Sequence, residues 1–153
     1  MRSMEKYSCE SETIDTKLIL PRDTNPHGNL YGGTLMDWID MVAAIVAMRH
    51  SNSLAVTASV DSVDFKYPVK QGDVLSMIGK ITWTGRTSME VEVRMCVEDL
   101  KTGKKKETNR AYLVLVAVGE NNKPVEVPQL IVEDAIEWEK AKKRREIRLA
   151  RGV

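Results

Sequence analysis

The chain has 153 residues, a formal net charge of +1, 42% hydrophobic residues and 29% charged residues. This length suits one domain better than two, and this composition is that of a globular protein rather than a disordered chain. No apolar run approaches the roughly 20 residues that cross a bilayer, and the first ten residues are polar. We therefore expect no membrane span and a cytoplasmic location.

Metal ligands and disulfide partners are scarce. The chain holds two cysteines, Cys9 and Cys96, and two histidines, His27 and His50, with no CxxC pair. A zinc site of the usual kind needs three or four such ligands close together. We therefore expect no structural metal.

The charge is distributed unevenly. Residues 139–151 carry seven basic and two acidic side chains, which leaves 16 basic and 20 acidic side chains elsewhere. The body is thus net acidic, which argues against a broad nucleic-acid-binding face. The basic tail itself is best interpreted as a solvated helix end, although its Lys and Arg side chains could also bind the phosphates of a ligand or a nucleic acid.

Residues 13–20 predict a first strand, which Pro21 ends. A loop follows at 21–33, with two prolines, three glycines and two asparagines. Apolar residues at steps of three and four predict a helix over 34–50. This helix is apolar around most of its circumference, so we expect other structure to wrap it.

Period-two patterns then predict strands at 54–65, 74–83, 87–99 and 110–118. Alternation in the 87–99 strand predicts that one of its faces is buried and the other is exposed to solvent. The 110–118 strand is apolar on both faces, so we expect the helix to cover one face and a partner to cover the other. Residues 131–151 have helical composition. Together these elements predict an α+β fold, in which an antiparallel sheet wraps round a long central helix.

Asp40 is the acid that stands out, because its helical neighbours Met36, Ala43 and Ala44 are apolar or small. Loss of water raises the basicity of a carboxylate, so this position suits catalysis, although an aspartate bonded to nearby backbone explains it as well. We interpret Asp37 as the partner of Thr34 in a capping box.

Gly32 and Gly33 lead into the same helix, where free N–H groups can bind an oxyanion. Asp40 lies two turns further on, so a reacting carbonyl could touch both the helix start and the carboxylate or its water. A glycine pair needed only for the turn is the alternative. Asn25 and His27 could add a polar contact from the loop, although an asparagine before proline is also an ordinary turn former.

Four blocks carry a resemblance to a known family: DTNPHGNLYGGTLMDWIDMVAAIVAMRH, VTASVDSVDFKYPVKQGD, ITWTGRTSMEVEV and LKTGKKKETNRAYLVLVAV. In this order they resemble the hotdog-fold acyl-CoA thioesterases of the acyl-CoA hydrolase type. The resemblance covers roughly 13–128 and implies a single hotdog domain there, with an N-terminal segment at 1–12 and a helical, basic C-terminal tail at 129–153. It also implies hydrolysis of fatty acyl-CoA to free fatty acid and CoA, without metal or other cofactor.

The resemblance also implies roles for individual residues. Asp40 matches the catalytic aspartate, which acts as general base or nucleophile, and Asn25 matches a second active-site residue that comes from the opposite subunit. The amide at Gly33 would polarise the thioester oxygen. Substrate-binding positions would be Gly32, Thr57, Ser59, Arg86, Thr87 and Ser88.

Members of the family pair as dimers, so the resemblance implies a homodimer as the minimum unit and favours a hexamer built as a trimer of dimers. The expected partner is acyl-CoA, with neither nucleic acid nor membrane. Two other functions stay open. One is a non-catalytic hotdog module that senses acyl-CoA, and the other is a nucleic-acid-binding protein that uses the basic tail.

Overall fold

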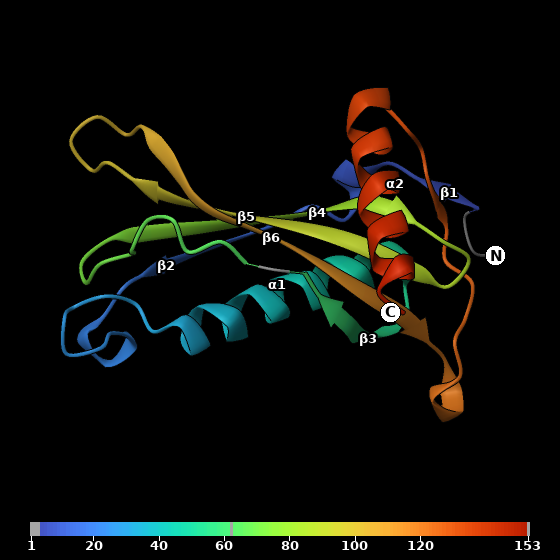
Figure 1. The fold of residues 1–153 in the computed structure, drawn as a ribbon, viewed down its shortest axis with the longest axis horizontal. Helices are drawn as coiled ribbons and strands as arrows, with labels where there is room; N and C mark the ends of the chain where they lie inside the picture. Colours follow the sequence, from blue (N-terminus) through green and yellow to red (C-terminus); the bar gives the residue numbers. More distant parts are fainter. Residues whose placement is uncertain (1–3, 62, 153) are drawn as a thin grey trace.

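The computed structural model describes residues 4–61 and 63–152. Its main elements are β2 (Thr13–Leu18), α1 (Gly32–Ser51), β3 (Leu54–Val60), β4 (Val74–Thr84), β5 (Ser88–Glu98), β6 (Lys105–Val118) and α2 (Ala135–Ala150). The five strands form one antiparallel sheet in the order β2-β4-β5-β6-β3. Helix α1 lies along one face and α2 stands against the other (Figure 1). The predicted α+β fold with a long helix and a C-terminal helix is confirmed.

Helix α1 packs on the sheet through side chains spaced three and four residues apart. Leu35, Ile39, Val42 and Val46 are all at most 3% exposed, which is the spacing that places side chains on one helix face. The close approach needs a residue without a side chain at Gly79 of β4. A Cβ there would lie 2.8 Å from Val42 Cγ1. The helix joins β2 to β3, the two edge strands, and so crosses the whole sheet.

The start of α1 differs from the prediction. The N-cap is Tyr31, and the first backbone bond within the helix runs from the Leu35 N–H to the Tyr31 carbonyl, at 3.0 Å. The capping box of Thr34 and Asp37 is therefore wrong, because both residues lie inside the helix. The sheet curls round α1 as expected, but it covers only one side of the helix. Met41 is 47% exposed on the side that faces away from the strands.

Two strands differ from their predicted bounds. β3 ends at Val60 rather than at residue 65, and residues 63–69 run instead as an irregular segment toward the start of α1. β6 begins at Lys105, five residues earlier than predicted. It also contains a bulge, because Met95 of β5 pairs with Asn109 while Cys96 pairs with Glu107.

Helix α2 covers the outer face of the sheet, which corrects two predictions. Glu90 and Glu92, expected on a wet face of β5, are 1% and 4% exposed. The guanidinium of Arg144 lies 3.8 Å from the centre of the Tyr112 ring of β6. The second cover of β6 at Tyr112 is therefore a helix of the same chain rather than a partner. Trp83 of β4 stacks on Trp138 of α2, with ring centroids 5.9 Å apart.

The basic tail is partly neutralised by this contact. Arg144 donates to both oxygens of Glu90, and Arg148 Nη1 donates to Glu90 Oε2 at 2.7 Å and to Asp61 Oδ2 at 3.0 Å. The Glu90 side chain is fully buried, so these charges are held where water is largely excluded. Two of the basic side chains thus serve the fold.

We expect Arg148→Met to lower the free energy of unfolding by about 3 kcal/mol, because it leaves a buried carboxylate short of a partner. Urea denaturation at neutral pH measures the change. The control is Lys142→Met, because Lys142 forms an exposed ion pair of 3.9 Å with Glu139 in the same helix. This substitution should lower the free energy of unfolding by less than about 0.5 kcal/mol. Equal effects of the two substitutions would contradict this prediction.

The two ends of the chain meet beside α1. β1 (Glu5–Lys6) pairs in parallel with β7 (Gln129–Leu130). The Lys6 ammonium donates to the Arg49 carbonyl at 3.1 Å and to Asn52 Oδ1 at 2.6 Å, so the N-terminal segment caps the C-terminal end of the helix. Among the helices within the described ranges, none is long and apolar enough to cross a membrane.

His50, at the end of α1, is completely buried, and its Nε2 lies 2.7 Å from the Pro128 carbonyl oxygen. Burial lowers the pKa of His50 below its usual value of about 6.5. The unfolded chain then binds a proton more readily than the folded one. The stability that His50 contributes is full above pH 6.5 and is lost as the pH falls.

We therefore expect the free energy of unfolding to fall between about pH 7 and pH 5. His50→Gln should reduce this dependence of the unfolding free energy on pH. His27→Gln is the matched control and should leave the dependence unchanged, because His27 is exposed. Urea denaturation across this pH range is the measurement. A wild-type slope that survives in His50→Gln would assign the effect to other groups.

Candidate functional site

The structure brings together two of the residues singled out in the sequence, Asp40 and Thr57. Thr57 Oγ1 donates a hydrogen bond of 2.6 Å to Asp40 Oδ1. Asp40 is the ninth residue of α1, and Thr57 lies on the edge strand β3 immediately before a bulge at Ala58. Bulges redirect side chains and often lie beside functional sites. The strand therefore fixes one carboxylate oxygen and leaves the other open.

Asp40 is exposed in the single chain, which differs from the expected burial among apolar neighbours. Its neighbour Ala43 is fully buried against the sheet, but Met41 and Ile45 are 47% and 38% exposed. The carboxylate thus lies at the border between the packed and the open side of α1. Only a further molecule covering the open side would remove it from water.

The start of α1 offers unpaired donors. Because the first intrahelical bond is donated by Leu35, the N–H groups of Gly32, Gly33 and Thr34 precede the hydrogen-bonded ladder. At 1.5 Å per residue, Gly33 and Asp40 lie about 10 Å apart along the axis. One thioester carbonyl does not span that distance. The expected simultaneous contact with both positions therefore fails within one chain.

Asn25 organises the loop before α1. Its Oδ1 accepts from the backbone N–H groups of His27 at 2.9 Å and Asn29 at 3.1 Å. This is the turn-forming role that the sequence allowed. None of the hydrogen bonds recorded for the described ranges uses the Asn25 amide nitrogen. With its oxygen fixed, the side chain holds that NH2 group in one direction, where it can donate to a ligand.

The remaining predicted positions lie on another part of the sheet. Ser59, after the bulge, lines a cavity of about 170 Å³ on the outer face together with Ser88, Arg145 and Arg148. Arg86 and Thr87 form the turn between β4 and β5, where Arg86 is exposed and lies 3.8 Å from Glu126. Within one chain, these side chains do not join Asp40 and Thr57.

The site offers a carboxylate, a hydroxyl and helix-end amides rather than metal ligands. Within the described part of the chain, no three His, Cys, Asp or Glu side chains are grouped so as to hold a metal ion. Sequence reasoning missed the direct contact of Thr57 with Asp40. It also missed Asn109, a buried amide at the bulge of β6, although a polar residue preceding an apolar strand was a visible signal.

Comparisons with known proteins agree on one family. Residues 27–104 match the thioesterase superfamily. The chain is similar to a Bacillus subtilis protein described as an uncharacterized acyl-CoA thioester hydrolase, with 42% identity over 87% of this chain and 78% of the relative. Human cytosolic acyl coenzyme A thioester hydrolase is 36% identical over 87% of this chain, which corresponds to 37% of that longer protein.

Solved structures agree as well. An acyl-CoA hydrolase from Staphylococcus aureus, in complex with butyryl coenzyme A, coenzyme A and coenzyme A disulfide, superposes with a TM-score of 0.92 at 40% identity, covering 96% of this chain and 92% of that one. A hexameric acyl-CoA thioesterase in its apo form also superposes with a TM-score of 0.92, at 44% sequence identity, and the match covers 98% of each chain. The chain therefore belongs to the hotdog-fold thioesterase superfamily, among the acyl-CoA thioester hydrolases.

Proposed function

We propose that this protein hydrolyses fatty acyl-CoA to free fatty acid and CoA, with Asp40 as general base or nucleophile. The observation that carries the assignment is the 2.6 Å hydrogen bond from Thr57 to Asp40 on the open side of α1. It holds a carboxylate in one orientation at a surface that a substrate can reach. Asn25 and the N–H of Gly33 are the proposed donors to the thioester oxygen.

The chemistry needs no metal or other cofactor. A thioester is an activated acyl group, so the free oxygen of Asp40 can either take a proton from water or attack the carbonyl carbon. Negative charge then develops on the thioester oxygen, and a helix N-terminus stabilises such charge through its N–H groups. When Asp40 acts as base, water attacks the carbonyl carbon, and Asp40 passes the proton of that water to the departing CoA sulfur. When Asp40 acts as nucleophile, the CoA thiolate leaves an anhydride between the acyl group and Asp40, and water then hydrolyses this anhydride to the fatty acid and free Asp40.

The solved relatives support these roles. The Staphylococcus aureus hydrolase has been studied as asparagine-to-alanine, aspartate-to-alanine and threonine-to-alanine mutants. Asn25, Asp40 and Thr57 are the same three residue types. The structure of this chain holds the last two in contact, and it leaves the amide nitrogen of the first free to donate.

The site needs a second subunit, because the start of α1 and Asp40 of one chain are about 10 Å apart. Two antiparallel α1 helices about a two-fold axis would place Asp40 of one chain near the helix start of the other. The open side of α1 exposes the apolar side chains Met41 and Ile45, and the edge strand β3 exposes Leu54 and Val56 at 67% and 50%. These surfaces suit burial between copies of the chain.

We expect a dimer as the smallest active unit, and a hexamer as the favoured assembly. Two further solved relatives, one of them from Yersinia pestis, are described as hexameric, and burial of the apolar side chains exposed on α1 and β3 supplies the driving force. Light scattering coupled to size exclusion measures the mass. A stable, active monomer of 17 kDa would reject both the assembly and the shared site.

The proposed groove for the rest of CoA uses Gly32, Thr57, Ser59, Arg86, Thr87 and Ser88. Ser59 supports this assignment, because its buried Oγ has no hydrogen-bond partner among the described residues. A buried hydroxyl without a partner suits a polar ligand. Arg86 supports it by its exposure at the end of the sheet, where it is free to meet a phosphate.

Release of free thiol from a panel of acyl-CoAs of different chain length tests the proposal. Turnover of at least one member supports an enzyme and reports the preferred chain length. Tight binding of acyl-CoA without turnover would instead favour a sensor. A salt-sensitive shift of nucleic acid in a gel, without thioesterase activity, would favour the nucleic-acid-binding alternative.

A further inference from the structure

Asn109 interrupts an apolar row. C-terminal to Asn109, the side chains of β6 that face α1 are all apolar and fully buried: Ala111, Leu113, Leu115 and Ala117. Asn109 belongs to this row by the regular alternation of the strand, and it directly follows the bulge that leaves Thr108 without a partner on β5. It is only 4% exposed. A polar side chain at such a position is a departure from the strand pattern of the kind found at functional sites.

Only one of the two polar atoms of the Asn109 amide has a hydrogen-bond partner among the described residues. Its Nδ2 donates to the main-chain carbonyl of Asp64, while its Oδ1 is buried without a partner among the described residues. The reverse orientation of the amide would bring two carbonyl oxygens together, so the Asp64 carbonyl fixes Oδ1 as the free atom. A buried acceptor without a donor is unfavourable, which makes Oδ1 a place for a donor from outside the chain.

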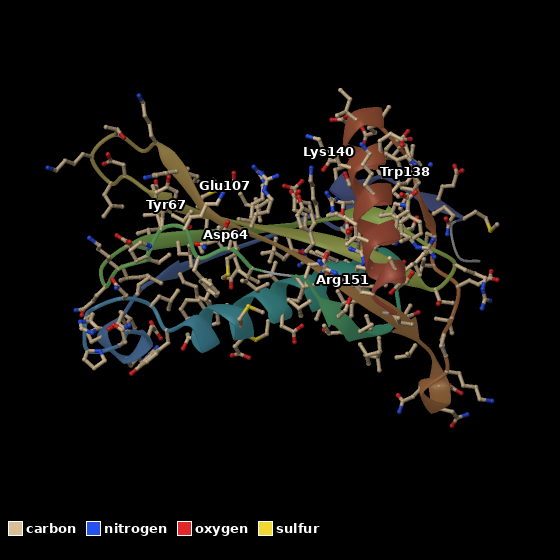
Figure 2. The ribbon with its side chains drawn as sticks, viewed as in Figure 1. Asp64, Tyr67, Glu107, Trp138, Lys140 and Arg151 are labelled. Carbon is tan, nitrogen blue, oxygen red and sulfur yellow. The ribbon has the colours of Figure 1, made fainter. Side chains whose placement is uncertain are left out.

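Asn109 also lines a cavity. It has a volume of about 270 Å³, and its lining includes Asn109, the apolar side chains Leu35, Phe65 and Val69, and Gly32 at the start of α1. The segment that contributes Phe65 also carries Asp64 and Tyr67, which lie next to Glu107 of β6 (Figure 2). The cavity thus runs from the helix start, where the thioester oxygen is proposed to bind, to a single unpaired acceptor.

We propose that this cavity receives the acyl chain and that Asn109 selects acyl groups that carry a hydroxyl. The inference rests on the proposed thioesterase function and names its substrate class. An unsubstituted chain leaves the buried Oδ1 without a donor, whereas a hydroxyl on the chain supplies one. The apolar lining accepts the rest of the chain in both cases.

The test compares acyl-CoAs of equal chain length with and without a hydroxyl. Butyryl-CoA is compared with its 3-hydroxy and 4-hydroxy forms, and hexanoyl-CoA with its 3-hydroxy and 6-hydroxy forms. We expect wild type to prefer at least one hydroxylated form about tenfold or more in kcat/KM, the size of effect that one buried acceptor produces. In Asn109→Leu, which keeps a similar volume without the acceptor, this preference should vanish and turnover of the unsubstituted chain should rise.

Thr108→Val is the matched control. It alters the neighbouring buried residue of the bulge, whose Oγ1 donates to the Met95 carbonyl at 3.3 Å, and it leaves the Asn109 acceptor in place. It should keep the wild-type preference. If Asn109→Leu does not fold by circular dichroism, Asn109→Ala replaces it, and the wild-type ratio remains measurable in any case.

Three results would overturn the inference: equal kcat/KM for both members of every pair in wild type, a preference for the unsubstituted chain, or a hydroxyl preference that Asn109→Leu retains. Failure of the underlying enzyme function is distinguishable, because no acyl-CoA would then be hydrolysed. Calorimetric Kd values for the same pairs would in that case replace kcat/KM and decide on the role of Asn109.

Discussion

Replacing Asp40 by asparagine should lower kcat by several orders of magnitude and leave the melting temperature close to that of wild type. The substitution removes the proposed base or nucleophile, but it nearly preserves the shape of the side chain. An asparagine oxygen can still accept the hydrogen bond from Thr57 Oγ1. Because Asp40 is exposed in the single chain, little core packing depends on its charge.

Asp37→Asn is the matched control for this prediction. Asp37 is also an exposed acid of α1, about one turn before Asp40, and no role in the reaction is proposed for it. Free-thiol release and thermal denaturation are measured on both variants. Near-wild-type turnover in Asp40→Asn would reject the assignment of Asp40, and an equal loss in Asp37→Asn would point to an effect of helix charge instead.

The order of elements could be read from the sequence because each carried its own periodicity. The helix and the strands β4 and β5 begin and end within two residues of their predicted bounds. The end of β3 was harder, since the alternating pattern continues to residue 65, whereas residues 63–65 lie outside the sheet. A pattern of period two describes an extended chain, and the neighbouring strand decides whether that chain is paired.

The outer face of the sheet shows what periodicity misses. Alternation correctly placed Glu90 and Glu92 on the face opposite α1, and solvent was the natural expectation for two acids. The cover comes from α2, about fifty residues further along the chain, whose Arg144 and Arg148 neutralise Glu90. The same charges were read as a solvated tail. Complementary charges distant in sequence leave no local pattern that would pair them.

The candidate site was predicted in part for a similar reason. Asp40 was identified as a candidate from its apolar and small helical neighbours, whereas Thr57 was identified only through the family resemblance. Their contact depends on α1 lying beside the edge strand that follows it, with the bulge at Ala58 next to Thr57. The sequence also suggested that one carbonyl could reach both Gly33 and Asp40. The length of two helical turns rules this out in one chain, so the proposed site needs a second subunit.

Activity should return when two inactive variants, Asn25→Ala and Asp40→Ala, are refolded together in equal amounts. If Asn25 of one subunit serves with Asp40 of the other, each variant alone damages both sites of its homodimer. Random pairing makes about half of all dimers mixed. Each mixed dimer has one site with both lesions and one site with none, as an isologous two-fold interface requires.

The expected recovery is therefore about a quarter of wild-type activity, because about half of the dimers contain one intact site of two. Free-thiol release measures the activity, and mass spectrometry of differently tagged chains verifies the mixing. Refolding each variant alone is the control and should give no recovery. If Asn25 and Asp40 served a site within one chain, every site in the mixture would keep one lesion. Absent recovery after verified mixing would thus reject the shared site and still leave Asp40 to be judged by its own substitution.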